Sequence, residues 1–294
     1  MHKGNAMLLA GACAGAVAAM LVAAAAVRSP GPAVAAGPPP PVAPSFTTSV
    51  ATTATSAPPE TSAKRQPVPD GASLAALAPG RLSVLVRDRT SGRDVVSYRP
   101  GALYTSASLV KLLIAMEALR QGVPADVVAE MLSRSDDDVA GRLWAKLGGP
   151  AIVLSWAKRI GMTSTRPPAD ATHWGATLVT ATDVTRFYAY LMDEVPAGIR
   201  QVVLRALDGA TEHGTDGFDQ FFGIPDAVKA ADWAVKQGWS CCDPGRNLHT
   251  SGLVGGRRYI VVVLTAQPAT TSWATATQRV TAVVKALSGP LGWS

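Results

Sequence analysis

The order of the periodic segments limits most strongly what this 294-residue chain can fold into. Two runs rich in β-branched residues, Arg81–Asp88 and Arg93–Tyr98, flank a short turn that contains glycine, and this pattern predicts a β-hairpin. The β signals return only near the C-terminus, at Trp233–Trp239, Asn247–Val254 and Tyr259–Gln267. This order predicts an α+β domain in which one five-stranded antiparallel sheet is formed from both ends of the domain.

Helical patterns fill the interval between the two groups of strands. Each opens at a proline, an aspartate or a small residue, and several close at glycine. The predicted helices are Pro124–Leu132, Asp136–Leu147, Pro150–Ile160, Ala181–Met192 and Ala197–Leu207, with a final helix at Thr271–Leu287. We therefore expect a helical block beside the sheet.

The segment directly after the hairpin is an apolar helix that carries one lysine. Leucine and methionine recur at helical spacing within Tyr104–Leu119, so this helix should be buried nearly all round. Ser108 and Lys111 lie one turn apart and project from the same face. Burial disfavours the charged form of a lysine, and a neutral amine can accept the proton of a serine. Taken alone, this short motif is better explained by a helix-entry serine and a lysine that reaches solvent.

The N-terminal region differs in composition from the rest of the chain. Residues 7–27 are unbroken apolar or small residues behind a short basic start, which fits a long signal peptide or a single membrane anchor. We assign residues 1–28 to that segment. Residues 29–70 are rich in Pro, Ala, Thr and Ser and should form a disordered linker. Residues 71–294 are then the folded domain, secreted or membrane-anchored outside the cytoplasm in the cell envelope.

Charge and potential ligand residues narrow the choice of partners. The net charge is +6, but the basic residues form no run or stripe, so we expect no nucleic-acid partner. The histidines lack metal-ligand spacing, and we expect neither a metal nor a cofactor. Cys241 and Cys242 can form a vicinal disulfide, stay free, or pair between chains. We expect a monomer that contacts a membrane only through its N-terminal segment.

Two further short motifs follow the serine–lysine pair. Ser135–Asp137 falls between two predicted helices, and Lys236–Gly238 lies on the first of the late strands. Each has an ordinary structural explanation: Ser135 is a suitable helix N-cap, and a lysine and a glycine can blunt or bulge an edge strand. The occurrence of all three motifs in this order is harder to explain structurally.

The three motifs together resemble the penicillin-recognising serine enzymes, and class A β-lactamases in particular. The resemblance runs from about Leu82 to the C-terminus. Val84–Tyr98 resembles the opening hairpin of that family, Tyr104–Lys111 its nucleophile turn, and Gly223–Gly238 the approach to its K-T-G strand. The resemblance implies a β-lactamase/transpeptidase-like fold.

The resemblance also implies a role for each motif in acyl transfer. Ser108 would be the nucleophile and Lys111 its general base, while Ser135 would relay a proton toward the leaving group. Lys236 would supply positive charge for a substrate carboxylate and help to hold Ser135.

The implied substrate-binding residues include two departures from the family pattern. The backbone N–H groups of Ser108 and Trp239 would form the oxyanion hole, and Gly238 would allow close approach of substrate to the strand. Asp137 stands where the family has an asparagine, and a carboxylate cannot donate a hydrogen bond to a substrate carbonyl. Gln237 replaces a threonine, although its amide can still donate.

The most serious departure from the family pattern concerns the residue that would support deacylation. Class A enzymes use a glutamate between the second and third motifs to activate water, and Ile160–Val179 contains none. Asp170 and His173 are the only stand-ins in that segment. Without a positioned base, an acyl-enzyme on Ser108 should persist.

We therefore expect an exported serine acyl-enzyme that acts on a small-molecule or peptide substrate, either a β-lactam or a peptidoglycan stem peptide, with poor deacylation. One alternative is a catalytically silent module that keeps the fold for binding or sensing in the cell envelope. Another alternative is a generic surface esterase, which competition between a β-lactam and an ester substrate would distinguish.

Overall fold

The structure is a computed structural model, and it describes residues 67–228, 232–242 and 245–293. The predicted N-terminal segment, residues 1–28, and all but the end of the predicted linker lie outside the described residues. Within the described part, no helix is both long enough and apolar enough to cross a membrane.

The central feature of the fold is the five-stranded antiparallel sheet, whose strand order is β2-β1-β7-β6-β5. Its strands are β1 (Arg81–Asp88), β2 (Arg93–Tyr98), β5 (Trp233–Ser240), β6 (Arg246–Val254) and β7 (Tyr259–Gln267). The last strand, β7, pairs with the first, β1, with Val84 opposite Val263. The prediction of one sheet built from both ends of the domain is confirmed.

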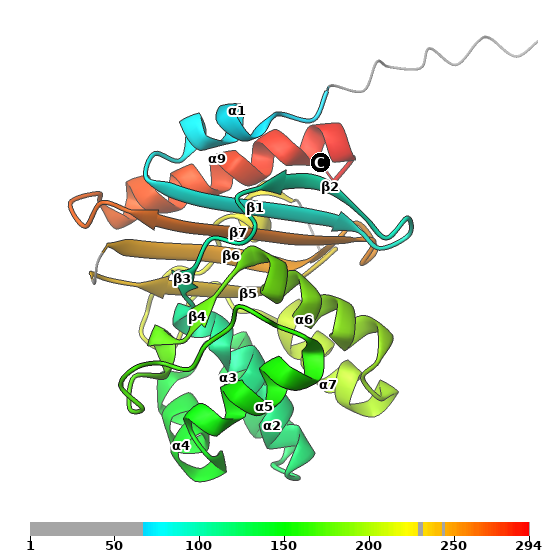
Figure 1. Cartoon of the computed structure of the whole chain (residues 1–294), viewed down its shortest axis with the longest axis vertical. Coiled ribbons are helices and arrows are strands. Elements are labelled where there is room, and N and C mark those ends of the chain that lie inside the picture. The colour runs from blue at the N-terminus through cyan, green and yellow to red at the C-terminus, as the bar shows by residue number, and fades with distance from the viewer. Residues whose placement is uncertain (1–66, 229–231, 243–244, 294) are drawn as a thin grey trace, which may run out of the picture. The chain divides into compact units, whose positions relative to one another are not determined.

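Helices cover both faces of this sheet, which explains why the central strand β7 is buried and apolar along most of its length. The side chains of β7 alternate between two cores: Val261 and Val263 pack on the side of helix α9 (Trp273–Leu291), whereas Val262 and Leu264 pack toward the helical block. Figure 1 shows α9 on one side of the sheet and the helical block on the other. The sheet therefore forms the middle layer of the domain.

Apart from α2, the helices of the helical block agree with their predicted boundaries to within about two residues. Its members are α2 (Lys111–Arg120), α3 (Ala125–Ser133), α4 (Asp137–Leu147), α5 (Pro150–Ile160), α6 (Ala181–Asp193) and α7 (Ala197–Asp208). The glycines that follow α4 and α5, Gly148 and Gly161, adopt the left-handed conformation that ends a helix.

Several short elements were not predicted because they are too short to show periodicity. They are α1 (Gly71–Leu77), α8 (Ile224–Ala227), the two-residue pair β3 (Tyr104–Thr105) and β4 (Leu178–Val179), and the 3₁₀ turns η1 (Ala107–Val110) and η2 (Trp174–Ala176). The turn η1 is the start of the predicted Ser108 helix, which becomes α-helical only at Lys111. Residues Lys111 to Ala118 are all buried, as the sequence predicted.

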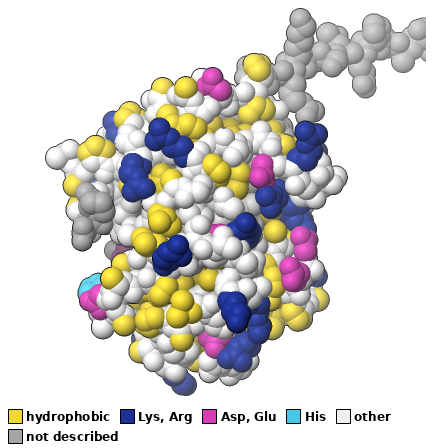
Figure 2. Space-filling view, in the orientation of Figure 1, with side chains coloured by type: hydrophobic (Ala, Val, Ile, Leu, Met, Phe, Trp, Pro, Cys, Tyr) yellow, Lys and Arg dark blue, Asp and Glu magenta, His cyan; other side chains and the backbone are white. Residues whose placement is uncertain are grey.

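Basic side chains are dispersed on the face of the molecule that Figure 2 shows. The Lys and Arg atoms form small separate groups among apolar and uncharged atoms. The Lys and Arg groups on this face are therefore not gathered into one stripe. Among the described residues, Arg87 pairs with Asp94 and Arg257 pairs with Asp208.

Candidate active site

The nucleophile turn is held between the sheet and the loop that precedes α6. The backbone N–H of Ser106 donates to the carbonyl of Thr177 at 2.7 Å, and β3 pairs with β4 just before it. His249 on β6 adds a third tie, because its Nε2 lies 2.8 Å from the carbonyl oxygen of Thr105. These contacts fix the backbone that carries Ser108.

Two residues of the site adopt a backbone conformation that side chains usually avoid. Ala107, directly before Ser108, has a φ of 46°, and Ser135 has a φ of 54°. A non-glycine residue in this left-handed region costs about 1–3 kcal/mol and persists only where the surroundings enforce it. Both residues lie next to the groups that would perform acyl transfer, where such strain commonly occurs.

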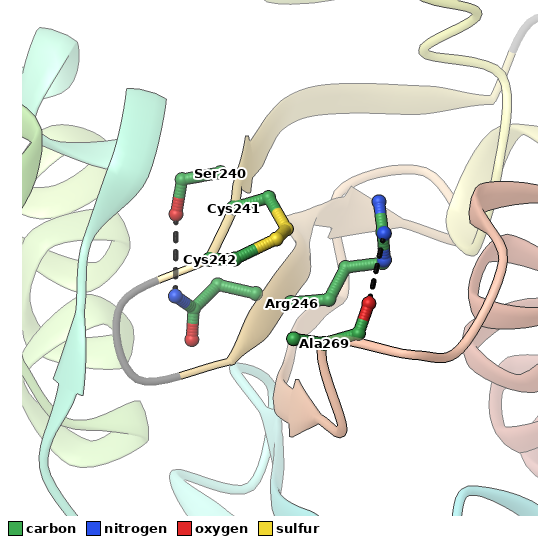
Figure 3. The surroundings of a disulfide bond; sticks show 6 residues. Ser240, Cys241, Cys242, Arg246 and Ala269 are labelled. Carbon is green, nitrogen blue, oxygen red and sulfur yellow. Dashed lines mark hydrogen bonds between the residues drawn. A yellow bond between two sulfur atoms is a disulfide. The ribbon is translucent and has the colours of Figure 1, made fainter.

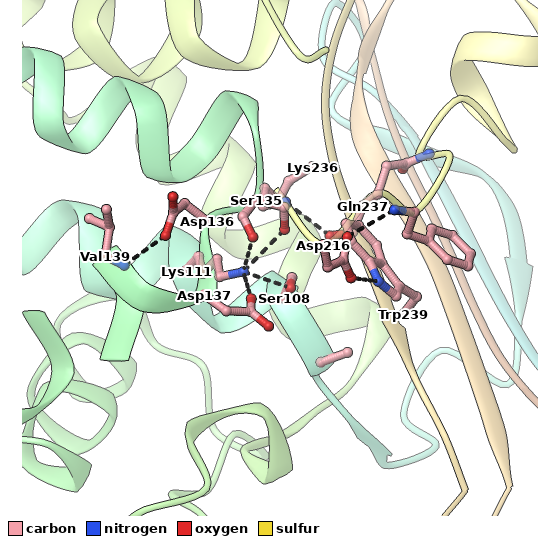
Figure 4. A network of polar contacts seen from close by, with 12 residues as sticks. Ser108, Lys111, Ser135, Asp136, Asp137, Val139, Asp216, Lys236, Gln237 and Trp239 are labelled. Carbon is pink, nitrogen blue, oxygen red and sulfur yellow. Dashed lines mark hydrogen bonds and ion pairs between the residues drawn. The ribbon is translucent and has the colours of Figure 1, made fainter. Parts of the chain in front are cut away.

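The Lys111 amine lies at the centre of the polar network in Figure 4. Its Nζ donates to Ser108 Oγ at 2.9 Å and to the carbonyl and hydroxyl oxygens of Ser135 at 2.6 and 3.1 Å. Asp137 Oδ1 lies 2.5 Å from the same nitrogen. The structure thus brings together Ser108, Lys111, Ser135 and Asp137, which the sequence placed in two separate motifs.

Burial and charge act on Lys111 in opposite directions. The side chain is fully buried, and this burial lowers the pKa of the amine below its usual range. Asp137 opposes the shift through its negative charge and its hydrogen bond, which both favour the ammonium. The neutral amine needed for general base catalysis is therefore promoted by the helix packing and restrained by Asp137.

Ser135 connects the two buried lysines. Lys236 on β5 donates from Nζ to Ser135 Oγ at 2.9 Å, so one hydroxyl contacts both amines. Burial lowers the pKa of Lys236 well below its usual value, and the nearby charge of Lys111 adds to the effect. The N-cap of α4 is Asp136, whose side chain accepts a hydrogen bond from the backbone N–H of Val139 at 2.8 Å. The alternative explanation, that Ser135 is the N-cap of this helix, is therefore wrong.

Gly238 allows β5 to pack directly against the nucleophile turn. A Cβ at this position would lie 3.0 Å from the carbonyl oxygen of Ser106 and 3.3 Å from Cγ of Leu109. The sequence assigned this space to the substrate, whereas the structure fills it with the turn that carries Ser108. Any side chain at position 238 would therefore separate Ser108 from β5.

Gln237 does not face the cleft. Its Nε2 donates to the carbonyl oxygens of Gln220 at 3.0 Å and Phe222 at 2.6 Å, and the side chain is buried. The amide that the sequence assigned to substrate binding is thus used to attach the segment before α8 to β5. Alternation along the strand explains this placement, because Lys236 and Gln237 point to opposite faces.

A cleft of about 1000 Å³ opens above Ser108. Ser108, Asp137 and Trp239 line it on one side, and Asp170, His173 and Trp174 line it from the loop before α6. Trp239 is held by its Nε1, which donates to Asp216 at 2.9 Å, and by stacking on Phe218. A cleft lined by a serine hydroxyl that is hydrogen-bonded to a buried amine is suited to a small acyl substrate.

Trp174 and Asp216 belong to this site, yet neither carried a sequence signal. The Trp174 ring centroid lies 4.8 Å from Lys111 Nζ, and the adjacent Gly175 packs against the backbone of Ala107. Trp174 begins the short turn η2, and Asp216 lies between α7 and α8. Neither residue has motif spacing to either serine, so only the tertiary fold reveals them.

The loop before α6 contains an acid–imidazole pair. Asp170 Oδ2 lies 2.7 Å from Nδ1 of the exposed His173, and Asp170 Oδ1 accepts from the backbone N–H and the hydroxyl of Thr172. These hydrogen bonds and the nearby imidazole lower the pKa of Asp170 to about 2.

Cys241 and Cys242 form a disulfide directly after β5 (Figure 3). This arrangement selects one of the three states that the sequence left open. Cys241 also lines the cleft, two residues beyond Trp239. Among the described residues, no group of His, Cys, Asp and Glu side chains is arranged to hold a metal ion.

Solved structures of class A β-lactamases share this architecture. The class A β-lactamase from Mycobacterium abscessus is 21% identical, with a TM-score of 0.60, and the match covers 75% of this chain and 97% of that one. The β-lactamase from Streptosporangium roseum is 16% identical, with a TM-score of 0.61 over 76% of this chain and 97% of that one. At these identities the likeness establishes the fold.

Sequence comparison provides a more similar relative. No protein-family model matches the chain. The protein named "Putative lipoprotein LppW" from Mycobacterium tuberculosis is 38% identical over 232 residues, which cover 74% of this chain and 72% of that protein. The chain therefore has a β-lactamase/transpeptidase-like fold and belongs to the family of LppW.

Proposed function

We propose that the protein is a cell-envelope serine acyl-enzyme that is acylated by β-lactams or peptidoglycan-like peptides and deacylates slowly. The observation that carries the proposal is the 2.9 Å contact between Ser108 Oγ and the Nζ of buried Lys111 at the base of the cleft. A serine beside a desolvated amine is an activated nucleophile. The name of the M. tuberculosis relative supports the envelope location.

Acylation in this site follows from the contacts of Lys111 and Ser135. Neutral Lys111 accepts the hydroxyl proton of Ser108 while Oγ forms a bond to the substrate carbonyl carbon. The carbon–nitrogen bond of the lactam or peptide then breaks, and the leaving nitrogen receives a proton through the Ser135 hydroxyl. Ser135 suits this relay because its Oγ contacts the amines of both Lys111 and Lys236.

The oxyanion hole in this proposal consists of the backbone N–H groups of Ser108 and Trp239. The absence of a side chain at Gly238 supports this assignment, because it lets β5 lie directly against η1. Donors fixed by a strand and a tight turn need little reorganisation as negative charge develops on the substrate oxygen.

The expectation of slow deacylation rests on the groups that line the cleft from the loop before α6. Hydrogen bonds from Thr172 and His173 lower the pKa of Asp170 to about 2. Such a weakly basic carboxylate removes a proton from water inefficiently. His173 directs one ring nitrogen to Asp170 and is exposed to solvent. Neither residue provides the buried, less acidic carboxyl group that efficient hydrolysis requires.

The proposal can be tested by incubating the purified protein with a fluorescent penicillin and separating it on a denaturing gel. We expect a covalent label that benzylpenicillin blocks by competition. Ser108→Ala should remove the label because the nucleophile is lost, and Lys111→Ala should reduce it at least about 100-fold because the base is lost. Circular dichroism of each variant provides the folding control, and label retained in folded Ser108→Ala would refute the assignment.

One observation favours a second candidate, the catalytically silent binding module. Asp137 contacts Lys111 at 2.5 Å and favours the ammonium, which cannot accept the serine proton. In that case the protein would bind a penicillin or a stem peptide in calorimetry without any covalent label. Saturable binding by wild-type protein that fully dissociates on dialysis would support this second candidate.

A further inference from the structure

We infer that Asp137 makes the cleft selective for cationic acyl donors, whose amine lies close to the reacting carbonyl. This inference rests on the proposed acylation of Ser108 and specifies the substrate class. The Asp137 carboxylate would favour aminoacyl or peptidyl groups with a free amine. It would disfavour acyl groups that place only carbonyl or carboxylate oxygens beside it.

The first step of the argument is the position of the Asp137 carboxylate. Asp137 is the first residue of α4, and its Oδ1 contacts the same Lys111 nitrogen that contacts Ser108 Oγ. Because Asp137 Oδ1 and Ser108 Oγ contact the same Lys111 nitrogen, the carboxylate lies beside any acyl group that Ser108 carries. Figure 4 shows Asp137 and Ser108 next to each other at Lys111.

The second step is the exposure of this carboxylate. The Asp137 side chain is 62% exposed and lines the cleft, whereas the amine of Lys111 is fully buried behind it. Lys111 contacts Oδ1, and in the described part of the chain no hydrogen-bond donor contacts Oδ2. A carboxylate oxygen only accepts hydrogen bonds, so a substrate amine is attracted there and a substrate carbonyl is repelled.

The third step is the character of the surrounding cleft. Trp174 and Trp239 line it, and an indole ring attracts a cation placed over its face. The Trp174 ring centroid already lies 4.8 Å from Lys111 Nζ, so there is room for an amine beside this ring. Asp170 adds further negative charge on the loop side.

Arg166 is the exception to this charge pattern, since its side chain is exposed and lines the same cleft. It lies on the loop before α6, whereas Asp137 contacts the amine that contacts Ser108. A substrate with an amine near its reacting carbonyl and an anionic group farther away would match both residues.

The test compares ampicillin with benzylpenicillin, which differ by one amino group on the side chain. At about pH 6 that amine is largely protonated. The initial rate of covalent adduct formation is measured by intact-protein mass for the full chain. We expect ampicillin to react about three- to tenfold faster than benzylpenicillin, and the preference to weaken as salt is added.

Asp137→Asn is the decisive variant, because it keeps the shape of the side chain and replaces an acceptor by a donor. The ratio of the two rates should fall to about one or below. Asp170→Asn is the matched control: it removes another carboxylate of the cleft that has no contact with Lys111, and it should lower the ratio far less than Asp137→Asn does.

The outcomes separate this inference from the proposed function. If neither penicillin forms an adduct with folded protein, acylation itself is refuted. If both form adducts at equal rates in the wild type, or if Asp137→Asn keeps the ampicillin preference, selectivity by Asp137 is overturned while the acyl-enzyme stands. An equal loss of preference in Asp170→Asn would also overturn the assignment to Asp137.

Discussion

In the proposed acylation, the chemistry of the site depends on Lys111, and the surroundings of this residue act on its pKa in opposite directions. Four acceptor oxygens surround its nitrogen, although an ammonium has only three hydrogens to donate. A neutral amine donates even fewer, so removal of the proton leaves acceptors unsatisfied and close to one another. In the proposed mechanism, Asp137 would therefore control how readily Ser108 loses its proton to Lys111.

Asp137→Asn should accelerate acylation at neutral pH severalfold. Burial already lowers the pKa of Lys111, and the variant removes the charge and hydrogen bond that oppose this effect. The neutral amine is then present at lower pH, so the rise of the acylation rate with pH should occur at a lower pH than in the wild type. Adduct formation followed across a pH series measures this shift, and coincident profiles for the two proteins would show that Asp137 does not restrain the base.

The contact between β5 and η1 is the central interaction at the scale of secondary-structure elements. It places the strand backbone against the nucleophile turn, and it depends on the missing side chain of Gly238. The opposite face of the strand is fixed by Gln237, which is hydrogen-bonded to the segment before α8.

Gly238→Ala should move β5 away from η1, because its Cβ would meet a backbone oxygen at 3.0 Å. We expect a loss of about 1–3 kcal/mol of unfolding free energy and at least a tenfold loss of acylation rate as the oxyanion donors separate. Gly141→Ala in α4 is the control, since nothing lies within 4 Å of its added Cβ. Denaturant unfolding and adduct kinetics measure both effects, and acylation at the wild-type rate in Gly238→Ala would contradict the role of this contact.

Elements with their own periodicity could be predicted from the sequence, and elements defined by tertiary contacts could not. The hairpin and the late strands carry β-branched runs, so their positions followed directly. By contrast, η1 and the β3–β4 pair exist because Ser106 bonds to Thr177 across the chain.

In the candidate site, too, some residues could be predicted from sequence patterns and others depend on tertiary contacts. The order of the three motifs predicted Ser108, Lys111, Ser135 and Lys236 as site residues, and the structure brings these four residues together. The burial of Gln237 was missed, because it depends on a loop that carries no pattern of its own.

At the scale of the whole molecule, one sheet separates two cores and fixes the site at its edge. The β7 strand contributes to both cores, and α6 and α7 pack against the sheet on the side of the helical block. His249 belongs to this framework: its imidazole is fully buried, contacts the Thr105 carbonyl, and accepts from the backbone N–H of Thr265.

His249 should make the stability of the domain depend on pH. Burial lowers the pKa of its imidazole to about 4, below the unfolded value of about 6.5. The unfolded chain therefore binds more protons in this interval, so the stabilising contribution is complete above about pH 6.5 and is lost as the pH falls toward 4. The full loss would be about 3 kcal/mol.

Urea unfolding at about pH 7 and about pH 5 tests this dependence, because the carboxylates with lowered pKa titrate mainly below that range. His249→Gln should flatten the difference between the two midpoints, since the amide can still donate to Thr105 but does not titrate. An equally steep difference in this variant would assign the pH dependence to other groups.

Peptide mapping of the penicillin adduct tests the central claim most directly, because it identifies the residue that reacts. The purified protein is incubated with benzylpenicillin, digested, and analysed by tandem mass spectrometry at several times after removal of free drug. We predict one drug molecule attached to Ser108, with an adduct that persists far longer than its formation takes. A folded protein without any modified peptide, or with the drug attached to another residue, would contradict the account.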